Sequence, residues 1–207
     1  MMRVKVCGLT RREDVLLCNQ LGVDALGFIL AESPRQVEIR NVSLLTKGLP
    51  PFISKVAVTM NPERQLLKDI SASRLFDYVQ FHGSEDPQII KALPLRTIKS
   101  ISIGIETPIE KIKDEMNKYK CADYYLFDSK MGKIKGGTGK SFNWDIFEHL
   151  DIKKPFILAG GLGIDNISTA LMKVNMAAVD LNSKLESSPG IKDKDLLNRI
   201  IDIINKH

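Results

Sequence analysis

The stretch RVKVCGLTRREDVLLCNQLGVDALGFIL, residues 3–30, decides the fold. It begins with a short apolar run at 3–7, continues through a charged amphipathic segment at 11–21, and ends in a second apolar run at 24–30. Short apolar runs joined by an amphipathic segment are typical of a β-α-β unit, in which a helix connects two parallel strands. The same alternation continues along the chain, so the sequence predicts an α/β protein with a parallel sheet.

Eight strands and eight helices are expected from this alternation. The apolar runs lie at 3–7, 24–30, 54–59, 77–81, 96–101, 123–127, 155–159 and 177–181. The amphipathic segments lie at 11–21, 41–48, 62–72, 86–92, 108–119, 143–149, 165–174 and 193–205. Division of 207 residues by eight gives about 26 residues per unit, which suits a small (β/α)8 barrel better than an open doubly wound sheet. We therefore predict a single (β/α)8 TIM barrel with eight parallel strands, with residues 1–207 as one domain.

Two of the helices carry capping signals at their starts. Thr10 precedes the first helical segment and Glu13 follows three residues later, which is the spacing of a capping box. Asn61 precedes Pro62, and proline is favoured at the first position of a helix. These patterns predict N-caps at Thr10 and Asn61.

Composition and charge limit the class of partner. The chain is 43% apolar and 27% charged, which is typical of a soluble globular protein. No segment approaches the roughly 18 apolar residues that span a bilayer, and the first residues carry charges where a signal peptide would be apolar. The net charge of +5 comes from 30 basic residues scattered among 25 acidic ones, so we expect an anionic small substrate, with no nucleic acid and no membrane, in the cytoplasm.

Three cysteines are too few and too far apart for a disulfide framework or a four-cysteine zinc site. No His or Cys cluster has the spacing of metal ligands, so no metal is expected. Cys18 lies on the apolar side of the first helical segment and Cys121 precedes a strand, and both are interpreted as packing residues. Cys7 differs because it ends a strand.

The carboxyl ends of the strands are where a barrel carries its active site. Cys7, His82 and Asp128 are the candidates for proton transfer at these ends. The segment KGGTGKS at 135–141 is similar to the end of a phosphate-binding Walker loop, but Ile134 stands where that loop requires glycine. We interpret this segment as a flexible lid over the active site.

Eight short motifs follow the strand ends in order. They are KVCGLT (5–10), GVDALGFIL (22–30), SPR (33–35), VQFHG (79–83), LFDS (126–129), GGTGKSFNW (136–144), LAGGL (158–162) and PGIKD (189–193). In this order the motifs resemble the phosphoribosylanthranilate isomerases of tryptophan biosynthesis, and the resemblance extends from the first strand to the last.

The resemblance implies a cofactor-free Amadori rearrangement of a small phosphorylated anion. N-(5-phosphoribosyl)anthranilate would become 1-(2-carboxyphenylamino)-1-deoxyribulose 5-phosphate, with Asp128 as the acid that protonates the ring oxygen and Cys7 as the base that removes the C2 proton. The resemblance also implies that Arg35 binds the anthranilate carboxylate. Because only a thiolate is basic, we hypothesise that Lys5 points into the barrel on the same face as Cys7, pairs with Asp180, and adds positive potential below the thiol.

The substrate phosphate is expected between the loops after the seventh and eighth strands. The expected phosphate-binding residues are Gly160 and Gly161 in the first loop and Ser183 and Lys184 in the second, and Gln80, His82 and Asp180 are further expected substrate-binding residues. His82 is interpreted as a neighbour of the site more than as a proton carrier, and Asp180 either orients the interior or touches substrate.

Two positions depart from the family pattern. Residues 180–186 read DLNSKLE where the family has DVSSGVE, and Thr59 stands where the family favours an aromatic residue. Lys184, in place of glycine, either helps to hold the phosphate or marks a site for a different ligand. Two alternatives therefore stay open, a barrel enzyme for another phosphorylated sugar and a non-catalytic binder of phosphorylated ligands. The oligomeric state, monomer or homodimer, also stays open.

Overall fold

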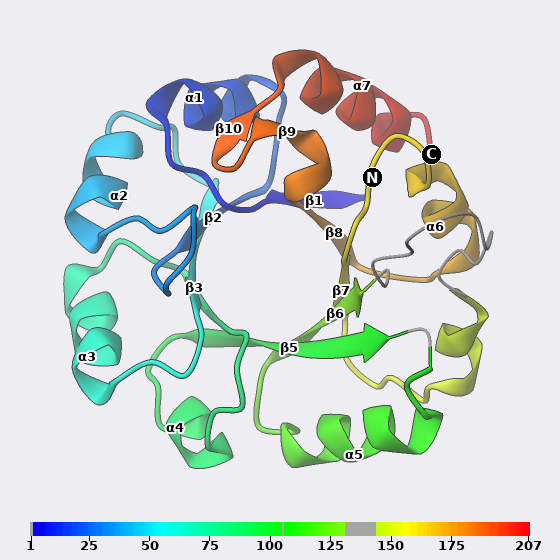
Figure 1. Cartoon of the computed structure of the whole chain (residues 1–207). Coiled ribbons are helices and arrows are strands. Elements are labelled where there is room, and N and C mark those ends of the chain that lie inside the picture. The colour runs from blue at the N-terminus through cyan, green and yellow to red at the C-terminus, as the bar shows by residue number, and fades with distance from the viewer. Residues whose placement is uncertain (1, 105, 131–143) are drawn as a thin grey trace.

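The computed structural model describes residues 2–104, 106–130 and 144–207. Eight parallel strands form a closed barrel in chain order, and the ring closes where β1 (Arg3–Val6) pairs with β8 (Ala178–Leu181). Helices surround this ring on the outside (Figure 1). The predicted (β/α)8 barrel is confirmed, whereas the segment predicted to form a lid, 135–141, lies outside the described residues.

Each predicted strand coincides with a strand of the barrel. The strands between β1 and β8 are β2 (Ala25–Ile29), β3 (Ser54–Thr59), β4 (Tyr78–Phe81), β5 (Arg96–Gly104), β6 (Tyr124–Lys130) and β7 (Phe156–Ala159). The helices are α1 (Arg12–Gln20), α2 (Ile39–Leu45), α3 (Arg64–Ser73), α4 (Pro87–Lys91), α5 (Ile109–Lys118), α6 (Ile167–Lys173) and α7 (Lys194–Asn205). In the place of the helix predicted at 143–149 the structure has a 3-10 helix, η1 (Trp144–His149).

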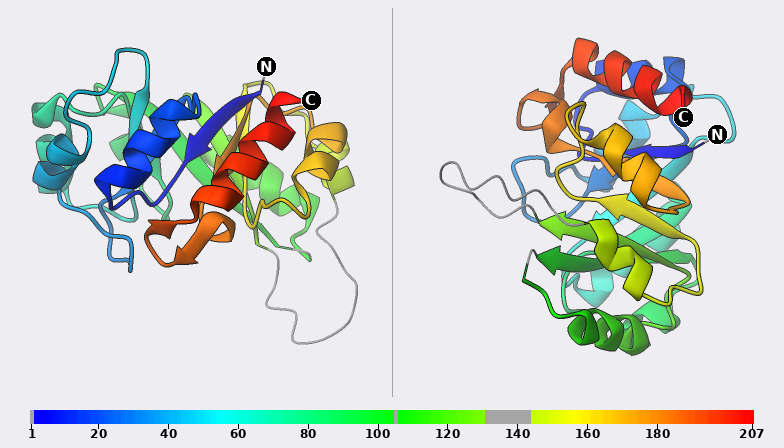
Figure 2. Two further views of the ribbon diagram at one scale, coloured as in Figure 1. Left: turned by 90° about the horizontal axis from the view of Figure 1, so that it is seen from above. Right: turned by 90° about the vertical axis from the view of Figure 1, so that its right-hand side faces the viewer.

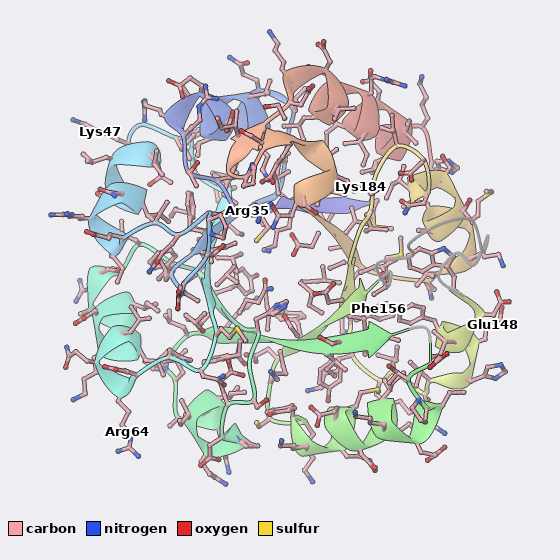
Figure 3. The ribbon with its side chains drawn as sticks, viewed as in Figure 1. Arg35, Lys47, Arg64, Glu148, Phe156 and Lys184 are labelled. Carbon is pink, nitrogen blue, oxygen red and sulfur yellow. The ribbon has the colours of Figure 1, made fainter. Side chains whose placement is uncertain are left out.

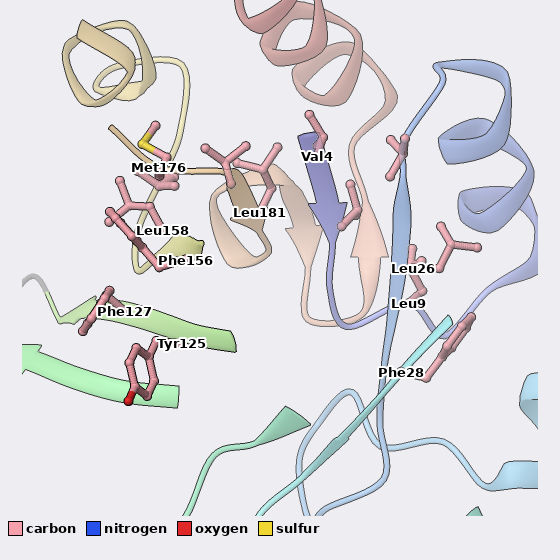
Figure 4. Close-up of a cluster of buried hydrophobic side chains, with 14 of the residues drawn as sticks. Val4, Leu9, Leu26, Phe28, Tyr125, Phe127, Phe156, Leu158, Met176 and Leu181 are labelled. Atoms are coloured by element: carbon pink, nitrogen blue, oxygen red, sulfur yellow. The ribbon is translucent and has the colours of Figure 1, made fainter. Parts of the chain in front are cut away.

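The main hydrophobic core lies between the strands and the helices. Strand side chains that point outward, among them Val4, Phe28 and Phe127, pack there at most 5% exposed (Figure 4). Phe127 makes edge contacts with Phe147 and Phe156, whose ring centroids lie 5.5 and 5.3 Å away. Burial of this apolar surface supplies most of the driving force for folding.

The barrel interior holds a second, smaller core. Its buried apolar members are Cys7, Val56, Val58, Ile98, Leu126 and Ala159. Residues two apart on a strand point to the same face, so the inward row of each strand continues from this core to the strand end. Polar side chains also lie in these rows, and the register of β1 against β8 sets Lys5 directly beside Asp180. The interior is therefore a packed floor beneath the strand ends.

The two predicted N-caps are wrong. The Thr10 hydroxyl donates to the carbonyl of Gly190, 2.6 Å away, and α1 begins two residues later, after an N-cap at Arg11. Asn61 lies in the left-handed region at φ 46°, and its side chain accepts from the N–H of Ser84. Both side chains connect loops that are far apart in sequence, and these tertiary contacts take the place of the local capping pattern.

A small extension after β8 was absent from the predicted elements. It contains a 3-10 turn, η2 (Ser183–Leu185), and a hairpin of β9 (Glu186–Ser188) with β10 (Ile191–Lys192). The extension lies over one end of the barrel (Figures 1 and 2). Among the described helices, none combines the length and apolar character needed to cross a membrane.

Candidate active site

A cavity of about 300 Å³ opens at the carboxyl ends of the strands. Nine of the ten residues predicted for the site line it: Cys7, Gln80, His82, Asp128, Gly160, Gly161, Asp180, Ser183 and Lys184. The barrel brings these residues together from five separate parts of the sequence. Arg35 is not among the lining residues and lies at the rim.

Cys7 and its neighbours form the floor of the cavity. Cys7 follows β1 directly, and its N–H donates to the carbonyl of Leu181, so the backbone of β1 continues to the thiol. Lys5 lies one inward position below, and its Nζ is 2.9 Å from Oδ2 of Asp180. The Lys5 and Asp180 side chains are only 3% and 8% exposed. The hypothesis that Lys5 points inward and pairs with Asp180 is therefore confirmed.

Burial and the charged groups in this floor shift the pKa of the Cys7 thiol in opposite directions. Burial raises the pKa of Cys7 above its ordinary value, and the positive charge of the Lys5 ammonium opposes that rise. Burial lowers the pKa of Lys5, but the Asp180 carboxylate and the Cys7 thiolate outweigh it and leave the pKa raised. Lys5 is therefore charged at neutral pH and favours the thiolate form of Cys7.

Asp128 lies in the inward row of β6 and lines the cavity. Its Oδ2 lies 3.4 Å from Nε2 of His82, and Nδ1 of His82 lies 3.1 Å from Oγ of Ser100. Nε2 of Gln80 donates to the same hydroxyl over 3.2 Å. A chain of polar groups from β4 and β5 thus orients the carboxyl of Asp128, and His82 is a neighbour of the acid, as the sequence indicated.

Two buried acceptors in the cavity wall have no partner among the residues that the structure describes. Oε1 of Gln80 and Oδ1 of Asp180 are buried side-chain oxygens without a hydrogen bond among the described residues. Buried polar atoms in folded proteins are nearly always paired, so an unpaired atom in a cavity wall marks a place for a ligand or water. Both residues are among those predicted to bind substrate.

The loop after β7 lines the cavity with Gly160 and Gly161. Gly160 and Gly161 have φ values of 95° and 63°, a region that favours glycine. A Cβ on Gly160 would lie 2.1 Å from the carbonyl oxygen of Ser129, so no larger residue fits there. Such a nest of glycine N–H groups suits a phosphate.

Lys184 lies in η2, opposite this loop. Its Nζ is 3.5 Å from Oδ2 of Asp165, and its side chain is 46% exposed (Figure 3). The ammonium is therefore free to move toward a bound anion. Ser183 lies beside it in the cavity wall, so the two residues predicted after β8 are both where the phosphate site was expected.

Arg35 is held by a residue that sequence reasoning missed. Its Nε and Nη2 lie 2.9 and 2.5 Å from the carboxylate of Glu186 in β9. Glu186 also accepts from Nζ of Lys192 over 2.8 Å, and Lys192 donates to Oδ1 of Asn182 over 2.9 Å. The Lys192 side chain is fully buried. The hairpin therefore fixes the orientation of Arg35 at the rim (Figure 3).

Two interpretations of other residues are resolved by the structure. Cys18 is fully buried in the main core and Cys121 packs against it, as predicted. Lys99 points out of the barrel, and its Nζ lies 2.9 Å from Oε2 of Glu85. Within the described ranges, no cluster of three His, Cys, Asp or Glu side chains is arranged to hold a metal.

Comparison with known proteins gives a consistent family. Residues 4–203 match the family model described as N-(5'-phosphoribosyl)anthranilate (PRA) isomerase. An N-(5'-phosphoribosyl)anthranilate isomerase of Petrotoga mobilis is 53% identical over 206 residues, which are 99% of this chain and 98% of that protein. The protein of the same name from Geobacter metallireducens is 41% identical over 93% of this chain and 94% of its own length.

Solved structures agree with these relatives. A phosphoribosyl anthranilate isomerase from Thermotoga maritima superimposes with a TM-score of 0.88 at 30% identity, and both chains are fully covered. A second crystal structure of such an isomerase, bound to reduced 1-(o-carboxyphenylamino)-1-deoxyribulose 5-phosphate, gives a TM-score of 0.86 at 28% identity, again with full coverage of both. The chain described here therefore belongs to the N-(5'-phosphoribosyl)anthranilate isomerase family.

Proposed function

We propose that the chain is a phosphoribosylanthranilate isomerase of tryptophan biosynthesis in which Cys7 is the base and Asp128 the acid. The observation that carries the two roles is their placement in one cavity, which the glycine loop at 160–161 also lines. We propose further that residues 1–207 act as one barrel domain. The cytoplasmic location and the lack of a nucleic-acid partner stay predictions.

The reaction needs an acid that donates one proton and a base that removes another. Protonated Asp128 donates to the ring oxygen of the ribose while the anilino nitrogen pushes its lone pair toward C1, so the C1–O bond breaks and a protonated Schiff base forms. The Cys7 thiolate then removes the proton from C2, and the electron pair of the C2–H bond forms the double bond of an enolamine. The enolamine takes a proton at C1 and loses the proton of its 2-hydroxyl, which gives the ketone.

The surrounding residues bind and orient the substrate in this proposal. The N–H groups at Gly160 and Gly161 hold the phosphate, with Ser183 and Lys184 on its other side. The unpaired oxygens of Gln80 and Asp180 accept hydrogen bonds from ribose hydroxyls. Arg35, oriented by Glu186, binds the anthranilate carboxylate through the N–H groups that Glu186 leaves free.

A turnover assay tests the function and the two roles together. Phosphoribosylanthranilate is prepared fresh, and the loss of its fluorescence is followed after the protein is added. The wild type is expected to turn it over, and Cys7→Ala and Asp128→Asn are each expected to lose at least about a thousandfold in kcat. Absence of turnover by the wild type contradicts the function, and full turnover by Cys7→Ala contradicts the assigned base. Cys18→Ala is the matched control and keeps wild-type kcat.

We also propose that the chain forms a homodimer through the opposite end of the barrel. Phe52 is fully exposed there, beside a hollow of about 320 Å³ whose walls include Tyr78, Tyr124 and Phe156. An exposed aromatic side chain next to an apolar hollow is a self-complementary surface. One relative, from Thermotoga maritima, is described as dimeric.

Light scattering on a size-exclusion column tests the dimer. The wild type is expected to elute with twice the chain mass and Phe52→Glu with the single mass, because a buried charge opposes association. Leu44→Glu, which changes an exposed apolar residue on α2, is the control and keeps the dimer. A wild type of single mass contradicts the proposal.

A further inference from the structure

Gly27 occupies an unusual position for a glycine. It lies in the middle of β2, paired with Val56 of β3, and its φ is outside the left-handed region. Glycine in the middle of a strand lowers stability because it loses more backbone freedom on folding and buries no side chain. The backbone conformation at this position does not require glycine. The reason must therefore lie in what occupies the space of the missing side chain.

The catalytic thiol and the buried ammonium fill this space. A Cβ on Gly27 would lie 2.9 Å from Sγ of Cys7, 3.0 Å from Cα of Cys7 and 3.1 Å from Nζ of Lys5. The first and second contacts are at or below the closest approach of real Cβ atoms, and one of them involves backbone, which cannot rotate away. The pairing of β1 with β2, Val6 against Leu26, brings Gly27 to this level.

The backbone of Gly27 fixes the same region from its other side. Its carbonyl accepts a hydrogen bond from the N–H of Leu9, 3.1 Å away, so the turn after Cys7 is tied to β2. The N–H of Cys7 is tied to β8 through Leu181. Because both neighbouring strands hold the backbone of Cys7, the thiol has little room to retreat from a methyl group at position 27.

We propose that Gly27 is a positioning residue for the isomerase reaction: its missing side chain is the space in which the Cys7 thiol and the Lys5 ammonium meet. This inference rests on the proposed function for the role of Cys7 as base. An added methyl group displaces the thiol or the ammonium from this space and weakens the electrostatic interaction that favours the thiolate. Glycine at position 27 therefore lowers the stability of the strand, but the space that it leaves allows the Cys7 thiol to lie near the Lys5 ammonium.

Several charged groups around Cys7 affect the pKa of its thiol. Lys5 and Asp180 lie in the barrel floor, Lys192 lies in β10, and Arg35 lies at the rim, and each interacts electrostatically with the thiol. Asp128 faces it from across the cavity. Among these groups the Lys5 ammonium opposes the rise in the pKa of Cys7 most strongly, so its displacement has the largest effect on the thiol.

The test measures the pH at which Cys7 is half ionised, from its rate of alkylation by iodoacetamide. Peptide mass spectrometry separates Cys7 from the other two cysteines. Gly27→Ala is expected to raise this midpoint by about one pH unit and to lower kcat about tenfold near pH 7.5, with little change in KM. Gly104→Ala changes a strand glycine whose added Cβ would meet, among the described residues, only the Thr107 side chain; it is the control and changes neither value.

A second comparison, in a variant that lacks Lys5, tests whether the effect of Gly27→Ala depends on the Lys5 ammonium. In Lys5→Met/Asp180→Asn, which removes the buried charge pair and keeps the site neutral, the midpoint is expected to be about one unit above wild type. In that background Gly27→Ala is expected to change the midpoint by less than about 0.3 unit. An equal effect of Gly27→Ala in both backgrounds, or no effect in the native one, overturns the proposal.

The design also separates this inference from the proposed function. The alkylation midpoint needs no substrate, so it tests the positioning role even if the wild type fails to turn over phosphoribosylanthranilate. If Gly27→Ala alone does not fold, the comparison of wild type with Lys5→Met/Asp180→Asn decides. An unchanged midpoint there shows that the ammonium does not act on Cys7, which overturns the proposal.

Discussion

Two buried lysine–carboxylate pairs of the same length have different surroundings. Lys5 and Asp180 meet at 2.9 Å inside the barrel, and Lys99 and Glu85 meet at 2.9 Å between the barrel and its helices. All four side chains are at most 8% exposed. Distance and burial therefore do not distinguish the two pairs, and the difference lies in how fully each group is hydrogen-bonded.

The charged groups of the Lys99–Glu85 pair are fully hydrogen-bonded within the protein. Nζ of Lys99 donates to the carbonyls of Phe81 and Gly83 as well as to Glu85, and it lies over the ring of Tyr119. The other oxygen of Glu85 accepts from the N–H groups of Asn61 and Gly83. The pair thereby holds together the loops after β3 and β4, which carry one wall of the cavity.

The hydrogen bonding of the Lys5–Asp180 pair is incomplete. Oδ1 of Asp180 has no partner among the described residues, and Nζ of Lys5 and Sγ of Cys7 lie 3.1 and 2.9 Å from the same point, the position of a Cβ on Gly27. A buried charge pair is weak evidence for a contribution to stability, but an unpaired atom facing a cavity indicates a ligand. The comparison teaches that incomplete hydrogen bonding marks the functional pair, and complete hydrogen bonding marks the structural one.

The largest expected effect comes from the satisfied pair. Lys99→Met leaves Glu85 buried and charged without its partner, so the free energy of unfolding should fall by about 3–5 kcal/mol. Urea denaturation followed by circular dichroism measures this change. The kcat of the folded fraction should stay within about twofold of wild type. A variant of unchanged stability contradicts the structural role of the pair.

The functional pair should respond in the opposite way. Lys5→Met is expected to lower kcat/KM about tenfold to a hundredfold near neutral pH, because the pKa of Cys7 loses its main opposing charge. Its free energy of unfolding should fall less than that of Lys99→Met, because burial already raises the pKa of Asp180, and a protonated Asp180 then leaves no unpaired charge. Activity and unfolding measured on one preparation separate the two effects. A larger loss of stability than of activity would reverse the comparison.

Acid should weaken the satisfied pair. Burial raises the pKa of Glu85, but its hydrogen bonds to Lys99 and to backbone N–H groups outweigh this and leave the pKa below its ordinary value of 4.5. A carboxyl with a lowered pKa stabilises the fold fully above pH 4.5, and this stabilisation is lost as the pH falls through the folded value. We therefore expect Glu85→Gln to show a shallower loss of stability below pH 4.5 than wild type. Parallel curves of unfolding free energy against pH would contradict this.

A third pair, exposed to solvent, should give the smallest effect. Lys184 and Asp165 lie 3.5 Å apart with about half of each side chain exposed. Exposed pairs contribute little to stability, so Lys184→Gly should leave the unfolding transition nearly unchanged. The KM for phosphoribosylanthranilate should rise about twofold to fivefold, because one cation near the phosphate is lost. An unchanged KM would show that Lys184 takes no part in phosphate binding, and Lys47→Gly is the surface control.

The sequence predicted the barrel and most of the site because both follow from local patterns. Alternating apolar runs fix strands and helices, and the barrel rule then assigns Cys7, Asp128 and the glycine loop to one end. The alternation of β1 also placed Lys5 and Cys7 on one face. The pairing of Lys5 with Asp180 was within reach because their strands close the barrel.

Other features depend on contacts that no local pattern records. Glu186 and Lys192 form a short hairpin whose order comes from tertiary ion pairs, and Thr10 bonds to Gly190 across 180 residues instead of capping α1. Gly27 lies within the strand predicted at 24–30, and no special role was predicted for it from the sequence. A glycine in a strand interior is nevertheless a signal that another group approaches the backbone closely. The approaching groups could be named only after the strands were in register.

The pH dependence of catalysis, set against the ionisation of Cys7, tests the central claim most directly. The claim is that the Cys7 thiolate, favoured by the buried Lys5, is the base of the reaction. The rising limb of kcat/KM reports the essential base of the free enzyme, and alkylation reports the thiol itself. We expect the two midpoints to coincide in wild type and to move upward together in Lys5→Met. A thiol midpoint that moves while the limb of kcat/KM stays in place would contradict the account.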